Sequence, residues 1–209
     1  MPSISPRLAD GRLSRRTVLL ATSLLLITAA GPRLHAAIAA ADGTPQDFIQ
    51  RLGDRTVAIL SEDAPDQQKL ARIKDLLDQA TDLNLVARLV MGRYWRSATE
   101  EQRQEYVRLF NALLMQTMAE RFSWYSGETF EIQDATPVDE RDTMVATRIL
   151  RPSGKPPIQV DWRVRQSDGR YLLIDIVAEG VSLVVSQRSE AAEFINRNGI
   201  DGLLQEMRE

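Results

Sequence analysis

Three carboxylate side chains stand where an acid or a base could act. Asp175 interrupts an otherwise apolar segment, Glu179 precedes a glycine turn, and Asp161 lies in a segment of alternating polarity. A carboxylate in apolar surroundings can act as a general base. The same side chains serve equally as structural partners for arginine or for backbone N–H groups, and the pattern favours that structural role. We therefore predict a protein that is not an enzyme.

The residue types that the chain lacks narrow the chemistry further. It contains no cysteine and one histidine, His35. Disulfides, thiol catalysis and a lipid-modified N-terminal cysteine are thereby excluded. Because His35 lies in a segment that we expect to be cleaved, the rest of the chain has no imidazole for a catalytic triad or a metal site. We predict no metal and no cofactor.

Residues 1–41 have the three parts of a cleavable export signal. An arginine-rich start precedes an uncharged apolar run at residues 18–30, and small residues crowd 36–41. The apolar run is shorter than the roughly 20 residues of a membrane-spanning helix. Arg15 and Arg16 resemble the pair of a twin-arginine signal, while the departures around this pair leave the general secretory route open. We predict that residues 42–209 work outside the cytoplasm.

The charge that remains after cleavage is acidic. Residues 1–41 hold five arginines and one aspartate, a net charge of +4, so an overall charge of −3 leaves −7 for residues 42–209. This balance argues against nucleic acid as a partner. A basic cluster of four arginines could meet a lipid phosphate or an acidic partner, and a solvated helix face explains it equally well: Arg93, Arg96, Arg103 and Arg108.

The first half of residues 42–209 has the apolar period of helices. Residues 44–60, a segment after Pro65 and residues 82–92 each carry an apolar stripe. The longest helix follows, with a capping box of Thr99 and Gln102 and a wide apolar face. Its length is sufficient to cover a whole sheet.

The second half changes to a period of two and predicts about four antiparallel strands. Residues 158–165 alternate strictly, and residues 166–169 are typical of a hairpin turn. Helices return at 190–196 and at 200–207, separated by a glycine stop. The fold class is α+β: a helical layer packed on one face of a curved antiparallel sheet, in a single domain. Such a fold often leaves an apolar hollow between the long helix and the sheet.

Aromatic and methionine side chains lie on both layers of this predicted fold. They can line a cavity for an apolar ligand, with methionine adapting to its shape. Periodicity does not distinguish a hollow core from a filled one, and by itself it favours the filled core.

Three segments together match a known pattern. Residues 89–99 contain GRYWRSAT, residues 174–183 read IDIVAEGVSL, and residues 199–203 read GIDGL. Their order and spacing, from about residue 44 to residue 206, resemble the MlaC family, also described as toluene-tolerance or ABC-transporter auxiliary proteins. The combination is far more specific than any one segment.

The resemblance implies a periplasmic lipid-transfer protein that shuttles phospholipid and supports the lipid asymmetry of the outer membrane. Its implied partners are an outer-membrane lipoprotein complex and an inner-membrane complex of an MCE-domain protein with an ABC transporter. The acyl tails would lie in an apolar pocket between sheet and helices. The resemblance reverses the preference for a filled core, and the pocket lining then follows from the pattern: Val90, Tyr94, Phe110, Leu114, Met118, Phe122, Tyr125, Phe130, Val160, Trp162, Ile174, Ile176, Val181 and Val184.

Two alternatives remain open at this point. A branch of the family is associated with hopanoid biosynthesis, which makes a polycyclic lipid an alternative cargo. An adaptor that stabilises an ABC transporter without carrying lipid is the alternative from another class.

Overall fold

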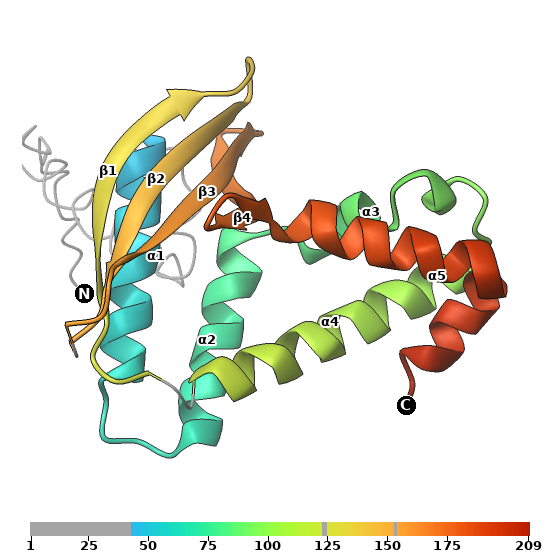
Figure 1. Ribbon diagram of the computed structural model, residues 1–209, viewed down its shortest axis with the longest axis horizontal. Coiled ribbons are helices and arrows are strands. Elements are labelled where there is room, and N and C mark those ends of the chain that lie inside the picture. Colours follow the sequence, from blue (N-terminus) through green and yellow to red (C-terminus); the bar gives the residue numbers. More distant parts are fainter. Residues whose placement is uncertain (1–42, 123–124, 153) are drawn as a thin grey trace, which may run out of the picture. The chain divides into compact units, whose positions relative to one another are not determined.

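A curved antiparallel sheet and five α-helices make up the computed structural model, which describes residues 43–122, 125–152 and 154–209 (Figure 1). The predicted export signal at residues 1–41 lies outside the described residues. The strands pair in chain order: β1 (Thr129–Pro137), β2 (Asp142–Leu150), β3 (Ile158–Ser167), β4 (Arg170–Ala178) and the short β5 (Val181–Ser182). The helices are α1 (Pro45–Leu60), α2 (Asp66–Ala80), α3 (Leu83–Met91), the 3-10 helix η1 (Gly92–Trp95), α4 (Glu100–Phe122) and α5 (Leu183–Glu206). The predicted α+β class is confirmed.

Local sequence signals set several of these boundaries. Thr44 and Asp47 form a capping box at the start of α1, and Pro45 occupies its first position. The backbone N–H groups of Thr99 and Gln102 each bond the other's side chain at the start of α4, as predicted. None of the helices in the described ranges is long and apolar enough to span a bilayer.

The described residues form two apolar cores. In the first core, α1 and α2 pack on the inner face of the sheet, with Phe48, Ile73 and Val145 fully buried. In the second core, α3, α4 and α5 pack on one another around Tyr106 and Met91. The expectation that the long helix covers the sheet is therefore wrong. Its wide apolar face is used by α3 and α5, which the period of α4 alone cannot reveal.

The C-terminal helix begins earlier than the sequence predicts. Ser182 is the N-cap of α5, and its hydroxyl accepts a hydrogen bond from the Val185 N–H at 3.0 Å. The carboxylate of Asp175 accepts a further bond from the Val184 N–H at 3.1 Å. This second cap comes from β4, so it is invisible to a local pattern. The predicted stop at Gly199 is a kink with φ 74° inside α5.

A buried carboxylate ties the β1–β2 turn to β3. Asp142 is fully buried, and its two oxygens accept hydrogen bonds from Arg165 at 2.7 and 2.8 Å and from Arg163 at 2.9 Å. The hydrogen bond from Arg165 holds the pKa of Asp142 below its ordinary value, and Arg163 acts in the same direction. Both arginines therefore favour the ionised form of this carboxylate.

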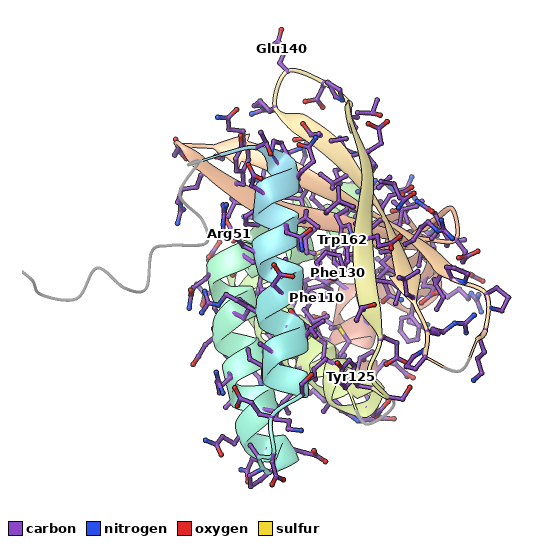
Figure 2. The ribbon with its side chains drawn as sticks, turned by 90° about the vertical axis from the view of Figure 1, so that its left-hand side faces the viewer. Arg51, Phe110, Tyr125, Phe130, Glu140 and Trp162 are labelled. Atoms are coloured by element: carbon purple, nitrogen blue, oxygen red, sulfur yellow. The ribbon has the colours of Figure 1, made fainter. Side chains whose placement is uncertain are left out.

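Asp142→Ala is expected to lower the free energy of unfolding by about 2 to 3 kcal/mol, because it removes hydrogen bonds between charged groups and leaves two guanidinium groups without their acceptor. Urea unfolding measures the loss. Glu140→Gln is the matched control, since Glu140 lies exposed at the tip of the same turn (Figure 2). Its effect should stay within about 0.5 kcal/mol. Equal losses in the two variants would contradict the role of Asp142.

The same carboxylate predicts a pH dependence. A pKa below the unfolded value of about 4 means that Asp142 contributes stability above that pH and that this contribution is lost as the pH falls through the folded pKa. The deficit of Asp142→Ala should therefore shrink between neutral pH and strong acid. A deficit that is constant over this range would show that the carboxylate acts by packing alone.

Candidate functional site

An apolar cavity of about 290 Å³ lies between α1, α2 and the inner face of the sheet. Nearly all of its wall is apolar, and α1 and α2 supply half of the lining residues. The full lining is Ile49, Leu52, Gly53, Thr56, Val57, Leu60, Ile73, Leu76, Leu77, Met118, Tyr125, Glu128, Thr129, Phe130, Ile149, Trp162, Leu173 and Ile176. A wall of this kind excludes charged ligands and favours hydrocarbon.

The stripe of α1 that faces the cavity follows from helical geometry. Ile49, Leu52, Thr56 and Leu60 lie three or four residues apart, so they fall on one face of the helix. The opposite wall follows from strand geometry, because residues that point to one side of a sheet alternate along each strand. Phe130 on β1 is paired with Ile149 on β2, and both side chains line the cavity.

Gly53 lets α1 approach β1 closely. A Cβ atom on Gly53 would lie 2.1 Å from Cζ of Phe130, well inside van der Waals contact. The aromatic ring therefore occupies the space that a side chain on α1 would fill. Figure 2 shows Phe130 and Trp162 beside α1, with Tyr125 nearer the end of that helix.

The polar atom of the Trp162 side chain has a hydrogen-bond partner outside the cavity lining. The indole N–H of Trp162 donates to Oγ1 of Thr147 at 2.9 Å, and that hydroxyl donates to the carbonyl of Val160 at 2.8 Å. Because these groups satisfy each other behind the wall, the indole presents its apolar ring to the cavity.

Three polar residues of the lining lie close together in the sequence, and we call Tyr125, Glu128 and Thr129 the polar end of the cavity. The three residues lie in and next to the segment that leads into β1. The hydroxyl of Tyr125 is 3.0 Å from that of Ser61, the C-cap residue of α1. This hydrogen bond links the end of α1 to the segment before β1 across the polar end.

Five of the fourteen residues predicted to line the pocket do line this cavity: Met118, Tyr125, Phe130, Trp162 and Ile176. Tyr94 and Phe110 pack in the second core instead, where the Tyr94 hydroxyl donates to Asn196 at 2.6 Å. The side chain of Phe122 lies outside what the structure describes. The others lie away from the cavity lining: Val90, Leu114, Val160, Ile174 and Val184 are buried or half-buried, and Val181 is 56% exposed. Contact of these nine residues with a ligand stays a prediction.

The sequence interpretation missed the contribution of α1 and α2. Leu52, Val57 and Leu77 have no special residue type, and only their helical stripe marks them. The apolar stripe can be read from the sequence, but it does not indicate which helix covers the sheet. The sequence pattern predicts a hollow beside the long helix α4. Met118 is the one described side chain of α4 that lines the cavity.

The three candidate acids have structural partners. Asp175 accepts the hydroxyl of Ser182 at 2.5 Å in addition to the cap of α5, Glu179 accepts the N–H of Gln159 at 2.7 Å, and Asp161 accepts the Gln159 side-chain amide at 2.8 Å. None of the three lines the cavity. Among the described residues, no group of three or more acids or histidines is placed to hold a metal ion.

The profile of the MlaC protein family matches residues 50–209. The chain belongs to the MlaC family. The resemblance predicted from the three sequence segments is thereby confirmed. A curated relative, the intermembrane phospholipid transport system binding protein MlaC of Haemophilus influenzae, is 23% identical over 182 residues, which are 82% of this chain and 84% of that protein.

A solved structure is similar as well. The phospholipid-binding protein of Ralstonia solanacearum, determined in complex with a phospholipid, superposes with a TM-score of 0.69 at 25% sequence identity. The match covers 79% of this chain and 96% of that structure.

Gly53→Ala tests whether the close approach of α1 to β1 keeps the cavity open. The new methyl group is expected to push the Phe130 ring into the cavity and weaken the binding of a neutral naphthylamine fluorophore about tenfold, the equivalent of about two lost methylene contacts. Fluorescence titration measures the affinity. The double variant Gly53→Ala/Phe130→Ala should restore binding. Unchanged affinity in the single variant would refute this role.

Proposed function

We propose that this protein is a phospholipid carrier that buries an acyl tail of the lipid in the cavity and leaves the lipid head group at the polar end. The observation that carries the proposal is the apolar cavity between α1, α2 and the sheet. Its volume lies at the lower end of the roughly 300 to 1,000 Å³ that is usual for ligand sites.

The energetics of hydrocarbon burial support a carrier of this kind. Each buried methylene group contributes about 0.8 kcal/mol, so eight methylenes of one tail contribute about 6 kcal/mol without any polar contact. The paired hydrogen bonds of Trp162 and Thr147 leave no polar atom in this part of the wall that an acyl chain would strand. The cavity can therefore bind an acyl tail tightly without requiring one particular tail structure.

The names of two relatives support a wider role. The Haemophilus relative is named for an intermembrane phospholipid transport system, and the Ralstonia protein holds a phospholipid. We place the carrier in the periplasm, as a single domain of residues 42–209 after cleavage of the export signal. There it passes lipid between an outer-membrane lipoprotein complex and an inner-membrane complex of an MCE-domain protein with an ABC transporter.

Mass spectrometry of lipid extracted from the natively purified protein tests the proposed cargo. We expect phospholipid at a stoichiometric level, because the apolar wall favours acyl tails and the polar end can receive a head group. A polycyclic lipid in its place would move the protein to the hopanoid-associated branch of the family. Protein that is folded and free of lipid would refute the carrier and favour an adaptor.

Met118→Lys is expected to lower the bound phospholipid more than tenfold, because an ammonium group would project into the apolar cavity. Phospholipid per protein, determined by phosphorus assay, is the measurement. Gln116→Lys on the exposed face of the same helix is the control and should keep its lipid. Thermal unfolding of both variants separates lost binding from lost folding. Full occupancy in a folded Met118→Lys variant would contradict the proposed tail site.

A further inference from the structure

The polar end of the cavity carries a carboxylate that its neighbours keep ionised. Glu128 is the one charged residue among the described residues that line the cavity. Its Oε2 accepts the N–H of Ser126 at 2.7 Å, and its Oε1 accepts the Ser126 hydroxyl at 2.8 Å. The backbone hydrogen bond from Ser126 lowers the pKa of Glu128, and the hydroxyl adds to this effect. A negative charge therefore stands at the edge of an otherwise apolar wall.

A guanidinium group lies on the neighbouring strand end. Thr129 pairs with Leu150 at the ends of β1 and β2, so Glu128 and Arg151 are the residues that adjoin these two paired strand ends. Arg151 is half-buried, and its Nε donates to the carbonyl of Pro156 at 2.9 Å, which fixes the guanidinium group against the β2–β3 turn. Its positive charge lowers the pKa of Glu128. The two side chains form no salt bridge with each other in the described part of the chain.

A carboxylate and a guanidinium group that stand side by side without pairing have unused hydrogen-bonding capacity. A carboxylate offers about four acceptor sites, of which Ser126 uses two. A guanidinium group has five N–H donors in a planar fork that suits phosphate, and the bonds to Pro156 use two of them. Together they offer an anion site and a cation site at the edge of a hydrocarbon pocket.

We infer that Glu128 and Arg151 select phospholipids whose head group carries a primary ammonium beside the phosphate, as in an ethanolamine head group. This inference rests on the proposed carrier function. Arg151 would donate to the phosphate, which all phospholipids share, and Glu128 would accept N–H bonds from the ammonium. A choline head group has no N–H to donate, and a glycerol head group leaves the net negative charge of the lipid facing the carboxylate.

The test loads the lipid-free protein from vesicles that contain equal amounts of phosphatidylethanolamine, phosphatidylglycerol and phosphatidylcholine. Mass spectrometry of the re-isolated protein gives the head-group ratio and the total occupancy. We expect the unaltered protein to enrich phosphatidylethanolamine, and Glu128→Gln to lower that enrichment about three- to tenfold at similar occupancy. This size is that of a charge-assisted hydrogen bond weakened by solvent.

Glu131→Gln is the matched control. Glu131 carries the same charge as Glu128 and lies three residues further along the chain, but its side chain is exposed and does not line the cavity. It should leave the ratio unchanged. Arg151→Gln should lower the retention of all three lipids alike. Phospholipid that binds with the same head-group ratio in Glu128→Gln, or an equal shift in Glu131→Gln, would overturn the selection by Glu128 and leave the carrier intact. Unaltered protein that takes up no phospholipid would instead refute the carrier itself.

Discussion

Packing of α1 and α2 against the inner face of the sheet is the contact on which the rest of the structure depends. It removes Phe48, Ile49, Ile73 and Leu76 from water, and each such side chain contributes about 1.5 to 3 kcal/mol. The same contact is close at Gly53 and Phe130 and open beside Trp162, so one interface both stabilises the fold and encloses the cavity. A cavity in a close-packed protein reduces stability. The surrounding contacts of this core therefore offset the cost of the cavity.

The polar groups near the cavity are of two kinds: those that are hydrogen-bonded outside its lining and those at its polar end. Thr147 and the indole N–H of Trp162 satisfy each other behind the wall, and Asp142 pairs with two arginines away from the cavity lining. Charge reaches the cavity at Glu128, at the polar end. An amphipathic ligand has the same arrangement as the cavity: hydrocarbon along most of the length and charge at one end.

Much of the fold could be predicted from local signals, whereas the site depends on contacts between distant segments. The Thr99–Gln102 capping box and the Asp168–Gly169 turn, with φ 50° and 71°, are properties of a few neighbouring residues and were predictable. The early start of α5 depends on Asp175 from another element, which no local pattern contains. Met118 and Trp162 were assigned to the pocket because their types are conspicuous, while Leu52 and Val57 were missed because any helix core uses them. The period of the apolar residues identifies the buried face of an element but not the element that covers this face.

The long helix α4 packs in both cores and therefore connects them rigidly. Tyr106 and Leu109 are fixed among α3 and α5, and Met118 projects into the cavity. About 14 Å of rigid helix separates Leu109 from Met118. Because the helix is continuous, a displacement of its packed end in the second core would also displace Met118 in the wall of the cavity.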